Sequence, residues 1–191
     1  MTTLISLLVR LYAAVFGTLQ RLTDRWLIGL AARFVFASAL FVYFWNSALT
    51  KIGPGLLGFL EPTDGAYVQI LPKMMEAAGY DTSAIEFFPY GLIVLLGTWA
   101  EFLLPLMIVL GLFTRAASLG FIVFIAVMSY VDITGHNLDA ATIGTLFDGK
   151  PGGLIADQRL MWGFLLLVLA LRGAGAISLD HLLARWWRER Y

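Results

Sequence analysis

The chain of 191 residues contains no cysteine, only two histidines and few charged residues, which make up 14% of the sequence. The lack of cysteine excludes disulfide bonds, thiol catalysis, thiolate-bound zinc and all-cysteine iron–sulfur clusters within this chain. Neither His136 nor His181 lies within an apolar segment, which argues against a bis-histidine haem between membrane helices. The formal net charge is zero and no Lys/Arg-rich run is present, so nucleic acid is not an expected partner.

Hydrophobic residues, in contrast, make up 60% of the chain, and the mean hydropathy is +0.82. Four apolar segments, at about residues 26–50, 87–113, 116–131 and 160–179, are candidates to cross a bilayer whose hydrocarbon core is roughly 30 Å thick. Only Thr114 and Arg115 separate the second segment from the third, which predicts a tight antiparallel hairpin. The sequence therefore predicts an all-α fold, an integral membrane four-helix bundle within residues 26–180, in contact with the lipid bilayer.

Residues 1–25 are predicted to form an N-terminal interfacial amphipathic helix. Leucines and Val15 follow one helical face, whereas Arg10 and Arg21 lie on the other. A cleaved signal peptide is the alternative, but Arg10 interrupts the apolar region and no small-residue cleavage site precedes the first span. Residues 181–191 are predicted to be a basic, aromatic cytoplasmic tail.

Basic residues are unequally divided between the two sides of this arrangement. Four lie on the side of the long loops 51–86 and 132–158, and eight lie on the other side: Arg10, Arg21, Arg25, Arg115, Arg172, Arg185, Arg188 and Arg190. Because cytoplasmic loops are enriched in Lys and Arg, both termini are predicted to face the cytoplasm. The long outer loops mix Gly and Pro with apolar residues, which predicts short helical turns on the membrane or over the mouth of the bundle.

Glu101 is the only acidic or basic residue between Phe87 and Thr114. A charged carboxylate near the centre of a membrane helix costs on the order of 3 kcal/mol, so a protonated state, an inward position or a cationic partner is expected. Arg33 is the predicted partner, because antiparallel neighbours would bring the two within one to two helical turns, a gap that arginine can reach. The pair has two interpretations: a structural ion pair that fixes helix register, or a proton-accepting carboxylate beside a bound ligand.

A second group of polar residues, Asn46, Lys51, Asp132 and His136, lies near the outer ends of the first and third spans. Asp132 and His136 are four residues apart, so one helical face can present both. These residues are candidates for a rim that holds a ligand, with solvated helix ends as the alternative. A metal site is not predicted, because it would need three converging ligands and only one of the four is a histidine. Arg115 is predicted to anchor the tight inner turn.

The chain also carries several short motifs at its helix ends. They are Arg33, the segment WNSALTKIG at 45–53, Glu101, the junction GLFTR at 111–115, His136, and the segment GAGAISLD at 173–180. Their order resembles the DoxX family of small four-helix membrane proteins over about residues 32–180. Two features depart from that family: Gly173-Ala174-Gly175 stands where Gly-Pro-Gly is usual, and the outer loops are longer than in the smallest members.

The resemblance implies a four-helix bundle, and we expect it in the cytoplasmic membrane of a bacterium or archaeon. For function it implies a range: one member type resembles the membrane subunit of a thiosulfate:quinone oxidoreductase, and others resemble accessory proteins of oxidative-stress complexes or metal-handling operons. We therefore expect a subunit that anchors a protein partner in a redox complex and binds quinone. The chain has no catalytic motif of its own, so any redox reaction needs a carrier from elsewhere. A transporter whose path passes Glu101 and a structural assembly factor are the alternatives; transport predicts inverted repeats, and the sequence contains no recognisable repeat.

Overall fold

A computed structural model describes residues 2–24, 26–55 and 57–190; Met1, Arg25, Leu56 and Tyr191, which include ends of the predicted segments 1–25 and 181–191, lie outside the described residues. The described residues form helices and turns, with one isolated β-bridge between Ile52 and Pro62. The prediction of an all-α fold is confirmed for this part of the chain. The helices are α1 (Thr2–Thr23), α2 (Leu27–Phe36), α3 (Val42–Leu49), α4 (Asp64–Ile70), α5 (Pro72–Ala77), α6 (Leu92–Leu110), α7 (Thr114–Thr134), α8 (Ala140–Ile143), α9 (Leu160–Arg172) and α10 (Leu179–Arg190).

Three π-helical turns, at Ala37–Phe41, Phe87–Gly91 and Leu154–Arg159, join or extend these helices. With them, five helical segments are long and apolar enough to cross a membrane: Thr3–Thr23, Leu27–Leu49, Phe87–Leu110, Thr114–Thr134 and Leu154–Arg172. The last four correspond to the predicted spans. The fourth predicted span begins at Leu154 rather than at Leu160, because the π-helical turn Leu154–Arg159 runs directly into α9. The fold is thus that of a multi-pass membrane protein, and the four-span bundle with an interfacial N-terminal helix stays a prediction.

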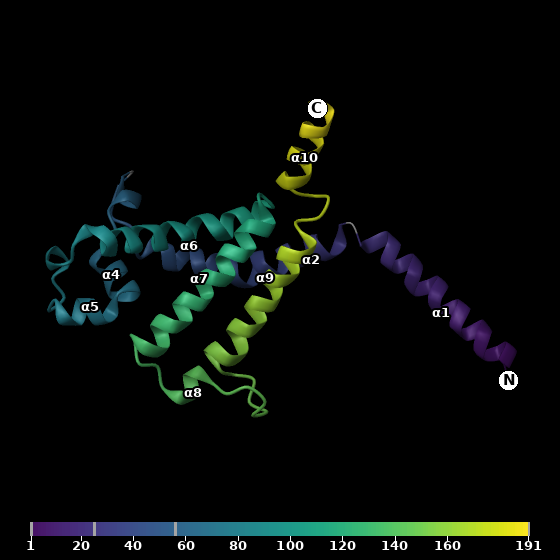
Figure 1. The fold of residues 1–191 in the computed structure, drawn as a ribbon, viewed down its shortest axis with the longest axis horizontal. Coiled ribbons are helices and arrows are strands. Elements are labelled where there is room, and N and C mark those ends of the chain that lie inside the picture. Colours follow the sequence, from purple (N-terminus) through teal and green to yellow (C-terminus); the bar gives the residue numbers. More distant parts are fainter. Residues whose placement is uncertain (1, 25, 56, 191) are drawn as a thin grey trace.

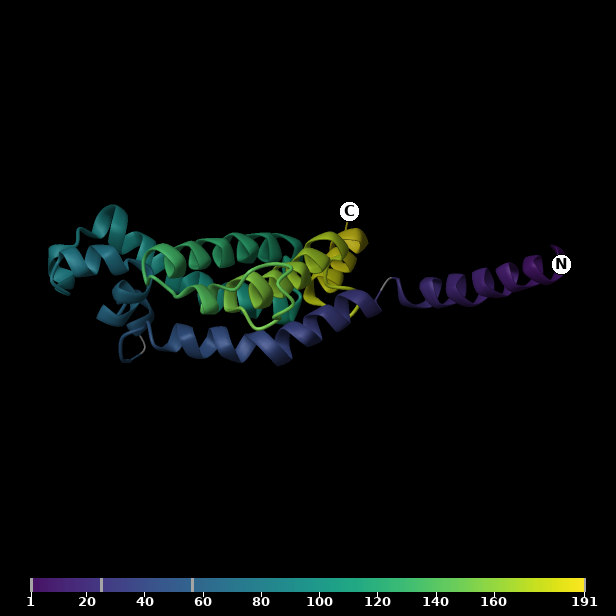
Figure 2. The same cartoon turned by 90° about the horizontal axis from the view of Figure 1, so that it is seen from below.

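The long helices other than α1 pack side by side, whereas α1 projects away from them (Figure 1, Figure 2). Phenylalanines form the centre of the core. Phe36 of α2 and Phe44 of α3 both meet Phe121 of α7, with ring centroids 5.7 and 4.6 Å apart in edge-on geometry. Such aromatic pairs add about 0.5–1.5 kcal/mol beyond the area that they bury. Ile108 of α6 and Leu166 of α9 are fully buried against the same cluster, so all four packed segments contribute to one core.

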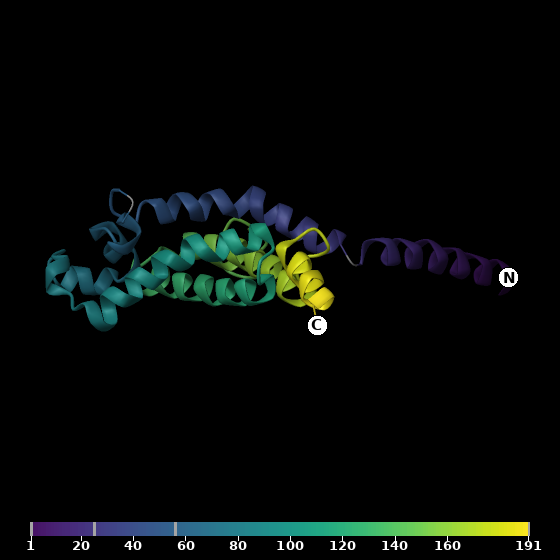
Figure 3. The same cartoon turned by 90° about the horizontal axis from the view of Figure 1, so that it is seen from above.

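The short helices α4 and α5 form a cap at the end of the bundle opposite the two termini (Figure 3). The prediction of short helical turns in residues 51–86 is therefore confirmed. Hydrogen bonds attach this cap to the end of α3: Thr63 N donates to the Lys51 carbonyl (3.0 Å), and Thr63 Oγ1 donates to the Thr50 carbonyl. Trp99 Nε1 of α6 donates to the Phe59 carbonyl (2.7 Å). These bonds place α4 over the end of α3 and the first turns of α6.

At the other end, the C-terminal segment holds the turn between α6 and α7. The Asp180 carboxylate accepts hydrogen bonds from the backbone N–H groups of Phe113 (2.6 Å) and Thr114 (2.9 Å), and Asp180 N donates to the Gly111 carbonyl. Unpaired N–H groups and the helix dipole both favour an anion at the start of α7. Arg115 is exposed and makes no hydrogen bond or ion pair within the described part of the chain. The hydrogen bonds that hold this turn therefore come from Asp180, and the electrostatic anchoring role of Arg115 stays a prediction.

Candidate functional site

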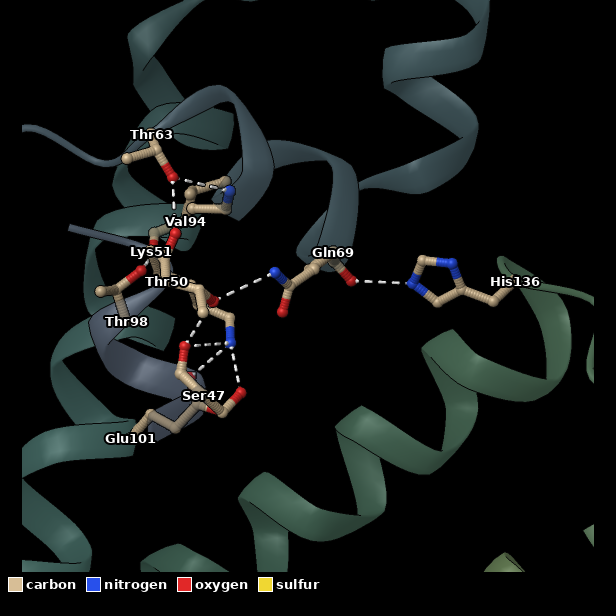
Figure 4. Close-up of polar contacts among 10 residues, drawn as sticks. Ser47, Thr50, Lys51, Thr63, Gln69, Val94, Thr98, Glu101 and His136 are labelled. Carbon is tan, nitrogen blue, oxygen red and sulfur yellow. Dashed lines mark hydrogen bonds and ion pairs between the residues drawn. The ribbon is translucent and has the colours of Figure 1, made fainter. Parts of the chain in front are cut away.

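Glu101 does form a buried ion pair, but its partner is Lys51. The Lys51 Nζ atom lies 2.7 Å from Glu101 Oε2, and the two side chains are only 6% and 5% exposed. Lys51 follows the end of α3, and its side chain turns back along that helix, where Nζ also donates to Ser47 Oγ (2.8 Å) and to the Ser47 carbonyl (Figure 4). The ammonium group therefore has one anion and two hydrogen-bond acceptors around it in a buried setting.

The predicted pair of Arg33 with Glu101 is wrong. The Arg33 guanidinium instead donates to backbone carbonyls: Nε to Ile108 (3.1 Å), Nη2 to Val109 (2.5 Å), and Nη1 to Ala174 and Ile177. Carbonyls in the last turn of a helix lack intrahelical partners, and the five N–H donors of arginine can satisfy several at once. Arg33 thus ties the end of α6 to the C-terminal segment.

The position of Glu101 along the bundle explains the change of partner. The helix that contains α6 begins at Phe87 and runs beside the α4–α5 cap before it reaches the level of α3. Its midpoint is therefore displaced toward the end of the bundle that carries the cap. As a result Glu101 lies beside Ser47, near the cap end of the helical segment Leu27–Leu49, and about 10 Å of helix separates it from Ile108, to which Arg33 binds.

A second ion pair, between the buried Arg159 and the partly buried Asp132, lies close by. Arg159 is 5% exposed, and its Nη1 atom also donates to Ser129 Oγ of α7 (2.9 Å). Arg159 is one of the four basic residues predicted on the side of the long loops, and its pairing with Asp132 was not predicted. A signal was present: Asp132 lies near the end of the third span and Arg159 directly before the fourth apolar run, and neighbouring antiparallel helices bring such positions to one level.

Both ion pairs line one cavity of about 300 Å³ among α3, α6 and α7, with the cap above it. The two positions that the sequence placed at different depths, Glu101 and the outer rim, therefore belong to one site. The other walls of the cavity are apolar or uncharged: Tyr43, Ser47, Gln69, Ile70, Ile93, Gly97, Phe124, Val127, Met128 and Val131.

The predicted rim residues divide in the structure. Lys51, Asp132 and His136 line the cavity, whereas Asn46 is exposed on α3 and is not part of its wall. The His136 Nε2 atom lies 3.1 Å from the Gln69 carbonyl oxygen, and Gln69 Nε2 donates to Thr50 Oγ1 (3.4 Å). Gln69, which the sequence analysis did not select, thus links His136 to the end of α3 across the mouth of the cavity (Figure 4).

Asp139, the next acidic residue, caps α8 instead of joining the cavity. Its carboxylate accepts hydrogen bonds from Thr142 Oγ1 (2.7 Å) and Thr142 N (2.9 Å). These bonds hold the pKa of the exposed Asp139 carboxyl below its usual value. Across the described residues, no three His, Cys, Asp or Glu side chains converge as metal ligands.

The lining of the cavity determines which ligands it can accept. Two cations and two anions cancel, so a neutral ligand is favoured over an ion. Arg159, whose buried Nε atom has no hydrogen-bond partner among the described residues, can donate a hydrogen bond to a ligand. Glu101 and Asp132 can accept hydrogen bonds, and the apolar walls suit a ring or an aliphatic group. Comparison of the chain with protein-family models, with curated proteins and with solved structures gives no match.

Proposed function

We propose that this chain is a DoxX-like integral membrane subunit that binds a quinone between α3, α6 and α7 and anchors a protein partner in a membrane redox complex. The observation that carries the proposal is the meeting of a buried ion pair and a partly buried one in one largely apolar cavity. Ion pairs of this kind contribute little net stability, so their burial beside a cavity favours a role in binding.

The size and chemistry of the cavity fit a quinone head group. Its volume of about 300 Å³ lies at the lower end of the range for small-molecule sites, roughly 300–1,000 Å³. A quinone has a flat ring with apolar faces and carbonyl oxygens at its edges. The Nε atom of Arg159, which lacks a hydrogen-bond partner in the described part of the chain, is a donor for one of those oxygens, and Phe124 and Met128 offer apolar surface to the ring.

Glu101 is suited to accept a proton from the reduced form of such a ligand. An ionised carboxylate offers about four lone-pair sites, and Lys51 is the one charged partner of Glu101 among the described residues. A quinone carries electrons and protons together, so a carboxylate or an imidazole beside it can exchange protons with it. Glu101 and His136 would orient the ring and hold a proton, while the redox partner would supply the electrons.

The edge of the cavity gives a membrane-soluble ligand a way in. Ile93 of α6 and Val127 of α7 line the cavity and are 47% and 57% exposed. Both lie on apolar helices of membrane-spanning length. A ligand with an isoprenoid tail would enter between these helices and leave its tail in the bilayer.

The proposed topology has four spans, both termini in the cytoplasm and α1 at the membrane interface. Every α1 residue from Leu4 to Phe16 is exposed, so this part of α1 does not pack against the bundle. If α1 crossed the bilayer, Arg10 would lie near its centre, at a cost of about 2.5–3.5 kcal/mol. An interfacial position leaves Arg10 and Arg21 among the head groups and avoids that cost.

The binding proposal is tested with purified protein in lipid nanodiscs and a short-tailed ubiquinone or menaquinone analogue. Saturable quenching of tryptophan fluorescence is expected. Glu101→Gln, His136→Ala and the cavity-filling Gly97→Leu should each weaken binding at least tenfold, about 1.4 kcal/mol. Asn46→Ala, which changes an exposed residue outside the cavity, is the matched control and should bind like the wild type.

Absence of saturable binding in a folded sample would refute the quinone site. Mass spectrometry after gentle purification then separates the alternatives. A stable protein partner without quinone would favour the assembly factor, and the absence of both would favour transport. A partner together with quinone near one-to-one stoichiometry is the result that we expect.

A further inference from the structure

The C-terminal helix α10 has an apolar face that no other part of the described chain covers. Every residue from His181 to Arg190 is exposed. Leu179, Leu182, Leu183 and Trp186 follow the spacing i, i+3, i+4, i+7 and therefore share one face of the helix. Their exposed fractions run from 36% to 59%. Ala184 and Arg188 lie on the opposite face.

The start of α10 is fixed at the ends of the membrane helices. Asp180 binds the backbone of the α6–α7 turn, and Ser178 Oγ accepts from His181 N (3.2 Å) while it donates to the Gly175 carbonyl (2.7 Å). The first turn of α10 is thus held level with Leu110, the end of α6, and Thr114, the start of α7. In Figure 1 the rest of α10 stands clear of the bundle beyond this point. A helix that begins at this depth lies where lipid head groups surround the protein.

Charge distinguishes this end of the molecule from the other. Eight of the nine arginines that the structure describes belong to it, against three acidic residues, Asp24, Asp180 and Glu189. The arginines are Arg10, Arg21, Arg33, Arg115, Arg172, Arg185, Arg188 and Arg190. All three acidic residues are already engaged: Asp24 pairs with Arg172, Glu189 pairs with Arg185, and Asp180 caps α7. This end therefore carries a net positive charge that complements an anionic surface.

We infer that α10 is an interfacial helix that binds an anionic lipid surface. Its apolar face would enter the boundary between head groups and acyl chains, as basic amphipathic helices do. The ring of Trp186 suits this boundary, and the Arg190 guanidinium lies 4.2 Å from its centroid, which places a cation beside it at the level of lipid phosphates. Lipid is favoured over a protein partner because the fixed start of α10 already lies at head-group level.

The absence of cysteine permits a site-specific test in the full-length protein. Leu183→Cys and Ala184→Cys are each labelled with an environment-sensitive fluorophore; position 183 lies on the apolar face and its neighbour 184 on the polar face. In nanodiscs of phosphatidylcholine with phosphatidylglycerol, the label at 183 should be blue-shifted. A lipid-attached quencher should quench it at least about threefold more strongly than the label at 184. Pure phosphatidylcholine or high salt should reduce this difference.

A charge variant tests the lipid preference itself. Replacing Arg185, Arg188 and Arg190 by glutamine should leave the bundle folded and abolish the difference between the two lipid compositions. Equal, water-like emission at both positions would overturn the inference, because α10 would then extend into water. Shielding of position 183 that needs two protein copies per nanodisc, or that is insensitive to anionic lipid, would overturn it in favour of a protein–protein contact or a purely apolar one.

Discussion

Replacement of Lys51 by methionine should expose the energetic consequence of the buried ion pair. Methionine has nearly the length of lysine but no charge, so Lys51→Met leaves the Glu101 carboxylate buried 2.7 Å from where its counter-ion was. Breaking a buried pair on one side costs about 3–5 kcal/mol, because one charge remains unpaired. Glu101→Gln leaves the ammonium group without its anion and should cost a similar amount.

The assay is thermal unfolding in detergent. For a chain of this length, 1 kcal/mol shifts the melting temperature by about 2–4 °C, so each single variant should melt about 6–20 °C below the wild type. The double variant, Lys51→Met with Glu101→Gln, removes both charges and should recover much of that loss, because neutral replacements of buried pairs are often tolerated. A coupling of at least about 1 kcal/mol between the two positions is expected.

The matched control is the same cycle with Arg33→Met in place of Lys51→Met. Arg33 binds carbonyls at the other end of α6, so its variant should destabilise the protein but show no coupling to Glu101→Gln. The reasoning fails if Lys51 and Glu101 are energetically independent, or if the coupling appears with Arg33 instead.

Three further predictions concern the architecture. Asp180→Ala removes the acceptor for two N–H groups at the start of α7 and should cost about 0.5–2 kcal/mol in the same assay; an unchanged melting temperature would contradict the cap. Gly111→Ala should lower stability, because Gly111 has φ +68° and an added Cβ would lie 2.6 Å from Ser178 Cβ, whereas Gly163→Ala in α9 meets open space and should raise stability by about 0.5–1 kcal/mol. In intact cells, a membrane-impermeant maleimide should label Asp148→Cys but not Arg188→Cys, and the reverse pattern would invert the proposed orientation.

The spans of this protein could be predicted from its sequence because hydropathy is a local property. Three of the four apolar segments became helices within about three residues of their predicted bounds, whereas the fourth, predicted at 160–179, spans Leu154–Arg172. The short junction at Thr114 did produce a hairpin between α6 and α7. That Glu101 needs a partner also follows from the sequence, since a buried carboxylate is costly wherever its helix lies. The cap helices were predictable as short turns, either on the membrane or over the mouth of the bundle, and the structure places Gln69 and Ile70 of α4 in the wall of the cavity.

The identity of each partner was decided by the tertiary structure, because it depends on how far one helix is shifted along another. Glu101 was assigned to the midplane because it lies in the middle of its own segment. The extension of that helix beside the cap moves Glu101 to Ser47 and Lys51, and leaves Arg33 to bind the carbonyls of Ile108 and Val109. The same axial offsets bring Arg159 to Asp132, 27 residues away in the chain, and unite the two ion pairs in one cavity. The sequence determined which charged residues must be buried or paired. The relative positions of the packed helices determined which residue each of them pairs with.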